Sequence, residues 1–164
     1  MAAIVDGRVF CVHAGLSPDI KLADQIDLLD RRVEIPQEGA LCDLMWSDPE
    51  DTIETWGMNG RGAGWLFGSK VAKEFNYING FKLIARSHQL VEEGYKYLFD
   101  ESLVIVWSVP NYCYRYSSFV NTRCGNTAAI MKVTEKGEQQ FSTFKSVSDT
   151  SKIKNYQFAI PYFL

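Results

Sequence analysis

The 164-residue sequence predicts a mixed α/β or α+β sandwich, and three observations support this fold class. Two short apolar runs flanking an Asp-Gly pair open the chain, and a stretch with helical spacing of apolar residues follows them. The second half then changes to a period of two, which is typical of strands. With 46% hydrophobic and 23% charged residues, the chain can bury one core and is too short for two. The same composition excludes a disordered or collagen-like protein.

The first elements are predicted as a hairpin and a helix. Ala2–Val5 and Val9–Val12 flank Asp6-Gly7, a pair typical of tight hairpin turns. An amphipathic helix is expected over Ile20–Arg32, ending before Pro36. Its apolar positions share one helical face and are Ile20, Ala23, Ile26, Leu29 and then Val33.

The middle of the chain is predicted to hold a loop and a short helix. Gly57–Gly64 contains four glycines around Arg61 and should be loop. Lys70–Tyr77 should be helical, and Asn79-Gly80 should end it because glycine accepts the left-handed conformation there.

Five runs with alternating or continuous apolar residues are predicted as largely antiparallel strands. They are Phe81–Ala85, Gly94–Phe99, Leu103–Trp107, Ala128–Val133 and Gln140–Phe144. The polar run Ser146–Asn155 is expected to be a flexible tail that ends in the apolar Ile160–Leu164.

Charge and composition exclude several classes of function. The net charge of −3 argues against a nucleic-acid partner and provides no polybasic membrane anchor. The densest apolar stretch, Leu103–Trp107, is far shorter than the roughly 20 residues that span a bilayer. No secretory signal is visible, and the four cysteines make no zinc-ribbon spacing. A cytoplasmic protein is expected, with the nucleus as a second compartment.

Two histidines and one arginine are the candidates for chemistry. His13 and His88 each follow a predicted strand, where α/β proteins place ligands, and neutral imidazole is a common metal ligand. Arg61 lies between Gly60 and Gly62, so its guanidinium could approach a phosphate closely. Structural histidines and a surface arginine remain the alternatives at this point. Tyr112 follows a strand end in a turn and should present its ring at a rim.

Five motifs in order carry a resemblance to a known family. The sequence resembles the phosphoprotein phosphatase family of metal-dependent serine/threonine phosphatases, in its type-2A-like branch. The Arg61–Gly68 stretch and the Pro161–Leu164 ending most resemble the phosphatase-six group of that branch and its fungal counterparts. The five motifs are Val12-His13-Ala14-Gly15-Leu16-Ser17-Pro18, Leu44-Met45-Trp46-Ser47-Asp48-Pro49, Arg61-Gly62-Ala63-Gly64, Arg86-Ser87-His88-Gln89 and Trp107-Ser108-Val109-Pro110-Asn111-Tyr112-Cys113-Tyr114-Arg115.

The resemblance implies a fold, a reaction and a set of site residues. The fold would be the C-terminal half of a metallophosphatase β-sandwich flanked by helices. The reaction would be hydrolysis of phosphoserine and phosphothreonine in proteins by two divalent metal ions, Mn, Fe or Zn. His13 and His88 would bind one metal, and Arg61 would hold the phosphate. Tyr112, Trp46, Leu90, Cys113 and Arg115 would line the substrate groove.

The resemblance also implies a regulatory tail and protein partners. Residues 1–145 would be the C-terminal part of the catalytic domain, and residues 146–164 the tail. Leu164 would be methyl-esterified at its carboxylate, and Tyr162 could be phosphorylated. The partners would be phosphoprotein substrates and the scaffold and regulatory subunits of type-2A-like phosphatases, with no nucleic acid and no membrane.

The sequence departs from the family in two places. The motifs GDxHG, GDxVDRG and GNHE, which supply the first metal's ligands and the general acid, do not occur in it. Residues 116–123 are inserted between the Cys-Tyr-Arg string and Cys124-Gly125-Asn126. At most a partial metal site is therefore expected, and this chain alone should be inactive. The alternatives are a non-catalytic module that competes for regulatory subunits, and an incomplete gene model or splice product.

Overall fold

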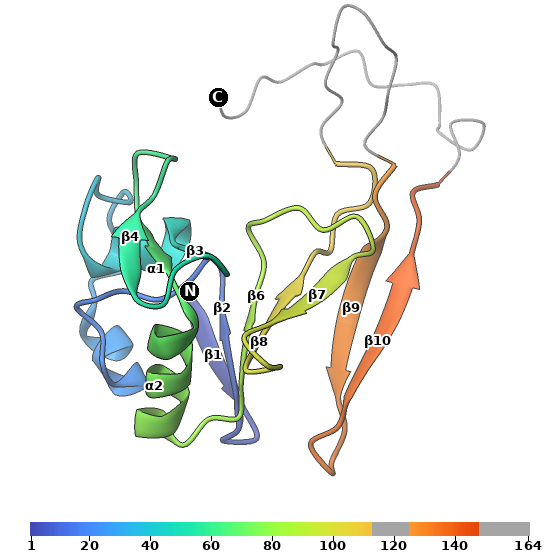
Figure 1. Ribbon diagram of the computed structural model, residues 1–164, viewed down its shortest axis with the longest axis horizontal. Coiled ribbons are helices and arrows are strands. Elements are labelled where there is room, and N and C mark those ends of the chain that lie inside the picture. The colour runs from blue at the N-terminus through green and yellow to red at the C-terminus, as the bar shows by residue number, and fades with distance from the viewer. Residues whose placement is uncertain (113–124, 148–164) are drawn as a thin grey trace, which may run out of the picture.

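The computed structural model describes residues 1–112 and 125–147 as a sandwich built on one mixed sheet (Figure 1). The five-stranded sheet has the order β1-β2-β6-β8-β7. Its strands are β1 (Ala2–Val5), β2 (Val9–Val12), β6 (Leu83–Arg86), β8 (Leu103–Val106) and β7 (Tyr95–Leu98). The predicted fold class is confirmed.

Strand direction is more varied than the sequence predicts. β2, β6 and β8 run parallel to one another, whereas β1 and β7 are antiparallel to their neighbours at the two edges. The expectation of largely antiparallel late strands is therefore wrong for β6 and β8. For β6 the reason is that the crossover from β2 passes through α2, which lies on the sheet face and returns the chain in the same direction. For β8 the reason is that the chain passes from β6 to the outer strand β7 and turns back between them, so β8 is antiparallel to β7 and parallel to β6.

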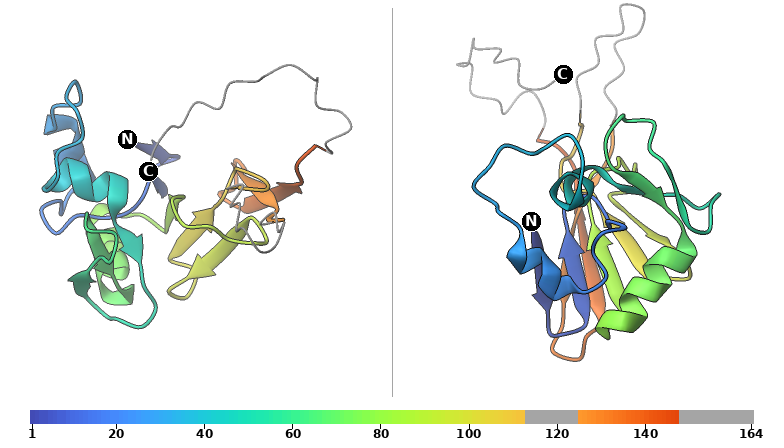
Figure 2. Two further views of the ribbon diagram at one scale, coloured as in Figure 1. Left: turned by 90° about the horizontal axis from the view of Figure 1, so that it is seen from above. Right: turned by 90° about the vertical axis from the view of Figure 1, so that its left-hand side faces the viewer.

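Alternate residues of the sheet pack into two separate apolar layers. On β2, Phe10 and Val12 belong to the larger core with the helices, whereas Val9 faces the opposite layer. The hairpin β9 (Ala128–Val133) and β10 (Gln139–Phe144) covers that opposite face through Met131, Val133 and Phe141. Figure 2 shows the helices on one side of the sheet and this hairpin on the other.

Two helices and a small sheet complete the helical side. α1 spans Ala40–Trp46, and α2 spans Ser69–Asn79, which extends the predicted helix Lys70–Tyr77 by one residue at its start and two at its end. Gly80 ends α2 with a left-handed φ of 71°, and its N–H is donated to carbonyls of the last turn. The three-stranded sheet contains β3 (Asp48–Pro49), β5 (Trp65–Phe67) and β4 (Trp56–Met58). Because β4 includes Gly57, the predicted loop begins only after Met58.

The predicted helix over Ile20–Arg32 is wrong in type and length. Only Ala23–Leu28 is helical, and it is a 3₁₀ helix, η1. Ile20, Ala23 and Ile26 are buried as the apolar pattern indicates, but Val33 is 52% exposed. Beyond η1, the side chain of Asp30 accepts the Arg32 N–H, a local bond that competes with helical hydrogen bonding.

The remaining strand predictions are confirmed within one or two residues, and β9 matches at both ends. The greater part of the predicted tail, residues 148–164, and the insertion at 116–123 lie outside the described residues.

Candidate functional site

The two histidines lie together at the end of the main sheet where its parallel strands terminate. β2 and β6 are parallel neighbours, so the residues that follow them emerge at the same end of the sheet. The ring centroids of His13 and His88 are 5.1 Å apart in an edge-on arrangement. The indole of Trp46, at the end of α1, lies 5.3 Å from the His88 ring and meets it edge-on. Three predicted site residues are therefore brought together from three segments.

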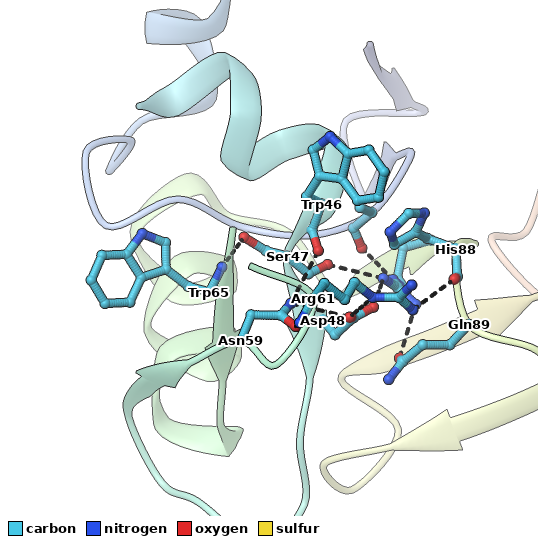
Figure 3. A network of polar contacts seen from close by, with 10 residues as sticks. Trp46, Ser47, Asp48, Asn59, Arg61, Trp65, His88 and Gln89 are labelled. Atoms are coloured by element: carbon cyan, nitrogen blue, oxygen red, sulfur yellow. Dashed lines mark hydrogen bonds and ion pairs between the residues drawn. The ribbon is translucent and has the colours of Figure 1, made fainter. Parts of the chain in front are cut away.

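Arg61 reaches this pair because its loop is fastened to Asp48. The Arg61 Nε donates to Asp48 Oδ2 at 2.6 Å, and one terminal nitrogen donates to the His88 carbonyl at 3.3 Å (Figure 3). Asn59 braces the loop by donating to both Trp46 O and Asp48 Oδ2 at 3.2 Å, and its Oδ1 accepts the Arg61 N–H. Gly64 has a φ of 67°, and a Cβ there would lie 2.6 Å from the Ser47 nitrogen. The loop can approach Ser47 this closely only with glycine.

Arg86 is fully buried and bonds to three segments of the site, at Ala14, at Ser47-Asp48 and at Gln89. Its guanidinium donates to the Ala14 carbonyl, to Ser47 O at 3.0 Å, to Asp48 Oδ1 at 2.9 Å and to Gln89 Oε1 at 2.9 Å. Burial lowers the pKa of Arg86 to about 10, with Asp48 acting in the opposite direction, so the group stays charged at neutral pH. Arg86 thereby ties the segments after His13 and His88 to Asp48, which in turn binds Arg61.

No role was predicted for Arg86 or Asp48 from the sequence. A signal was available, because Arg86 is the one charged residue at the end of the buried strand Leu83–Arg86. A charged side chain at such a position implies a buried partner, which here is Asp48.

Both imidazoles are neutral at physiological pH. Burial, together with the nearby Arg61 charge, lowers the pKa of His88 to about 4. Burial and then the Arg86 charge lower the pKa of His13. The His88 Nε2 is buried and has no hydrogen-bond partner among the described residues. A neutral imidazole with an unused buried nitrogen beside a second neutral imidazole fits metal ligation.

The site is not a complete metal cage within the described ranges. In residues 1–112 and 125–147, no group of three or more His, Cys, Asp or Glu residues could hold a metal ion. His13 borders an open hollow of about 450 Å³, whose lining residues are Met1, Ala2, Ala3, Cys11, Val12, His13 and Met45. Of the two imidazoles, His13 therefore borders open space, whereas the Nε2 of His88 is buried.

Of the other predicted groove residues, Leu90 and Tyr112 are among the described residues. Leu90 is 43% exposed and lies two residues after His88. Tyr112 is 42% exposed, and its ring meets Trp107 edge-on at 4.8 Å. Cys113 and Arg115, and the tail residues Tyr162 and Leu164, lie outside the described residues.

The class of protein follows from a family model. The model described as calcineurin-like phosphoesterase matches residues 1–92, more than half of the chain, including His13, Arg61 and His88. The chain therefore belongs to this metallophosphatase family.

Particular relatives narrow the resemblance to serine/threonine phosphatases. Serine/threonine-protein phosphatase ppe1 of Schizosaccharomyces pombe is 57% identical over 153 residues, which are 93% of this chain and 47% of that protein. The phosphatase 6 catalytic subunit of Drosophila melanogaster is 53% identical over the whole chain and 51% of its own length. The chain thus spans about half the length of the curated relatives it matches.

A solved structure agrees with the fold. The serine/threonine phosphatase from Saccharomyces cerevisiae with similarity to human phosphatase PP5 superposes with a TM-score of 0.76 at 26% identity. The match covers 90% of this chain and 47% of that one. No helix within the described ranges has the length and apolar character needed to cross a membrane.

Proposed function

We propose that this chain supplies one half of a protein serine/threonine phosphatase site that acts on phosphoserine and phosphothreonine in proteins. The observation that carries the proposal is the pairing of His13 and His88, 5.1 Å apart, beside an arginine bonded to the His88 carbonyl. The relatives that match the chain are named as phosphatases, which favours an enzyme over the interaction-module alternative.

His13 and His88 would hold one of two divalent metal ions, and the family's chemistry points to Mn, Fe or Zn. When bound, such a metal pair polarises a phosphoryl oxygen and makes a water molecule nucleophilic at neutral pH. The lowered pKa values of both imidazoles keep their nitrogen lone pairs available for binding. Trp46 packs edge-on against His88 and limits the ways in which that ring can turn.

Arg61 would hold the phosphate of the substrate. Its Nε is bound to Asp48 and one terminal nitrogen to the His88 carbonyl, which fixes the plane of the guanidinium. The side chain is 38% exposed, so the rest of the planar fork can bind phosphate oxygens from the solvent side. Its positive charge would also stabilise the charge that develops on the phosphoryl group during transfer. Trp46, Leu90, Tyr112, Cys113 and Arg115 would line the groove around the phosphate.

The 164 residues by themselves would not turn over a phosphopeptide. The two imidazoles cannot complete a two-metal centre, and the three family motifs that bring the other ligands and the general acid do not occur in the sequence. The hollow beside His13 is where those ligands would approach.

A turnover assay with metal analysis tests this proposal. The chain is incubated with Mn²⁺ and a phosphothreonine peptide, and its bound metal is measured in parallel. We expect no phosphate release above the background and fewer than two metal ions per chain. Sustained turnover with two metals bound would contradict the half-site.

A titration with Zn²⁺, followed by NMR of the two imidazoles, tests the ligand assignment independently of turnover. The His13 and His88 resonances should shift together, and His88→Ala should weaken the response of His13. If the two rings respond to different zinc concentrations, they do not share one ion.

Residues 146–164 are proposed as a regulatory tail. Methyl esterification of the Leu164 carboxylate and phosphorylation of Tyr162 would tune the binding of scaffold and regulatory subunits, and the protein would act in the cytoplasm and nucleus. Pull-down of subunits with the chain and with a variant lacking Leu164 tests the tail. Equal recovery would argue against it.

A further inference from the structure

Asn126 connects the two ends of the segment between Tyr112 and Gly125, and it has no part in the proposed phosphate chemistry itself. Its side chain is buried just before β9, and all its polar atoms are engaged. Oδ1 accepts the Tyr112 N–H at 2.8 Å, whereas Nδ2 donates to the Val109 carbonyl at 2.8 Å and to the Thr127 carbonyl at 3.1 Å. The side-chain amide of Asn126 therefore bonds to both ends of the turn at 109–112, to a carbonyl at its start and to an N–H at its end. We call this set of hydrogen bonds the clasp.

Backbone and side-chain bonds extend this clasp to both ends of the segment between Tyr112 and Gly125. The Asn111 N–H is donated to the Asn126 carbonyl at 3.0 Å, and the Gly125 N–H to Asn111 Oδ1 at 3.4 Å. Asn111 adopts a left-handed φ of 52°, which turns the chain sharply at this point. The residues on the two sides of this segment, 111–112 and 125–126, are thus hydrogen-bonded directly to each other.

The clasp also fixes the aromatic pair at its base. The Trp107 Nε1 donates to the same Val109 carbonyl at 2.8 Å, and the Tyr112 ring meets the Trp107 ring edge-on. Trp107 is buried, so it anchors the turn to the sheet. Tyr112 is held from its backbone by Asn126 and on its ring by Trp107.

The clasp lies at the same end of the sheet as the histidines, where the parallel strands terminate. β8 runs parallel to β6, and β6 to β2, so the residues after β8 emerge where His13 and His88 emerge. Resting on the proposed function, we propose that Asn126 is a positioning residue. It sets Tyr112 at the rim of the phosphate site and makes that rim independent of residues 116–123.

The chemistry of the amide makes the proposal specific to asparagine. Alanine would leave the Tyr112 N–H and the buried turn without this partner. Aspartate would keep the acceptor for Tyr112 but would place a second oxygen against the Val109 carbonyl, where a donor is needed. Both substitutions should therefore loosen the turn, although aspartate has the same shape.

Hydrogen exchange of the Tyr112 amide, measured by NMR on the full chain, tests the positioning role. We expect Asn126→Ala to speed exchange at Tyr112 about tenfold, the effect of losing one buried hydrogen bond. Ser108→Ala is the matched control, because Ser108 directly precedes the turn and donates to the Ala129 carbonyl, with no bond to Asn126 or Tyr112 among those that hold the turn. It should leave exchange at Tyr112 unchanged.

Removal of residues 116–123 provides the second variant and leaves Asn126 in place. Exchange at Tyr112 and the Trp107 indole N–H resonance should both stay as in the parent chain. If this removal speeds exchange as Asn126→Ala does, or if Asn126→Ala changes nothing, the proposal is overturned. If Asn126→Ala fails to fold by circular dichroism, the removal variant alone decides in the same way.

A kinetic split distinguishes positioning from general stability. In a chimera that carries the first half of the Schizosaccharomyces pombe relative ahead of Met1, Asn126→Ala should raise KM for a phosphopeptide several-fold and leave kcat within about twofold. A loss confined to kcat would contradict placement at the rim. If the chimera has no activity at all, the proposed function fails, while the exchange results still decide the clasp.

Discussion

Asp48 is the residue on which the charges of the site depend. It is 4% exposed and accepts from Arg86 at 2.9 Å and from Arg61 at 2.6 Å. Arg86 has no exposed side-chain surface and remains charged, so its positive charge is offset inside the protein by this carboxylate. The position of Arg61, the proposed phosphate-binding residue, therefore depends on the buried ion pair of Asp48 with Arg86.

Substitution of Asp48 tests this dependence. Asp48→Asn should lower the free energy of unfolding by about 3–5 kcal/mol, because it leaves the Arg86 charge buried without its carboxylate. Urea unfolding measures the change. Asp100→Asn is the control, since Asp100 pairs with Lys73 on the surface and its side chain is 87% exposed. It should cause no measurable loss, and an equal loss in both variants would contradict the role given to Asp48.

Asp43 predicts a pH dependence of stability. It is buried on α1 and accepts from Ser17 Oγ at 2.7 Å, and burial raises its pKa in the folded chain. In the window above the unfolded value of about 3.9, the folded chain therefore binds more protons than the unfolded chain. The contribution of Asp43 to stability is present below that value and is lost as the pH rises through the folded pKa.

Comparison with Asp43→Asn isolates this effect. The asparagine can still accept from Ser17 and does not ionise, so the variant should gain stability relative to the parent as the pH rises from about 4 to 7. Thermal unfolding of both chains across this range measures the difference. A difference that stays constant with pH would show that Asp43 does not titrate in the window.

At the scale of elements, the segment around η1 is held by the last residue of α2 more than by its own helical propensity. Asn79 Oδ1 accepts the Ala23 N–H at 2.8 Å, and Asn79 Nδ2 donates to the Lys21 carbonyl at 2.9 Å. This cross-connection explains why the apolar pattern at Ile20, Ala23 and Ile26 buries its residues without forming the long helix it predicts.

Asn79→Ala should therefore destabilise the fold by about 1–3 kcal/mol, since it removes both bonds and leaves the Ala23 N–H without a partner. Exchange of the Ala23 amide should accelerate with it. Tyr77→Ala provides a control on the same helix, because Tyr77 is 88% exposed. Equal effects of the two substitutions would contradict the connection.

Strand positions could be predicted from the sequence because β2, β6 and β8 are short, nearly continuous apolar runs, buried on both faces of one sheet. The parallel direction of β6 and β8 could not be predicted, because it depends on the crossover through α2 for β6 and on the placement of β7 beyond β8 for β8. His13, His88 and Arg61 were predicted as candidates from their residue types and loop positions, and the structure places them next to one another. Arg86 could have been predicted as a buried charge at the end of an apolar strand, but its partner Asp48 could not, because an ion pair between distant segments leaves no local pattern.

At the scale of the whole molecule, no described residue covers the edge strand β1 of the main sheet. Every residue of β1 is exposed, with Ile4 at 49% and Val5 at 38%. Exposed apolar edge strands pair readily with other chains. The hollow beside His13 opens along the same strand.

The isolated chain should therefore bind the dye ANS or self-associate. Size-exclusion chromatography with light scattering, and ANS fluorescence, measure this directly. Ile4→Lys should reduce both signals, because charge on an edge strand discourages pairing. A monodisperse parent chain with no ANS signal and a cooperative melt would contradict the open edge.

The central claim is that His13, His88 and Arg61 form the phosphatase half-site of this chain. The most direct measurement is the kcat/KM of the Met1-fused chimera on a phosphothreonine peptide with Mn²⁺, for the parent and for Arg61→Ala and His88→Ala. We predict measurable turnover in the parent and losses on the order of 10²–10³-fold or more in each variant. Turnover that survives either substitution at the parental rate would contradict the claim.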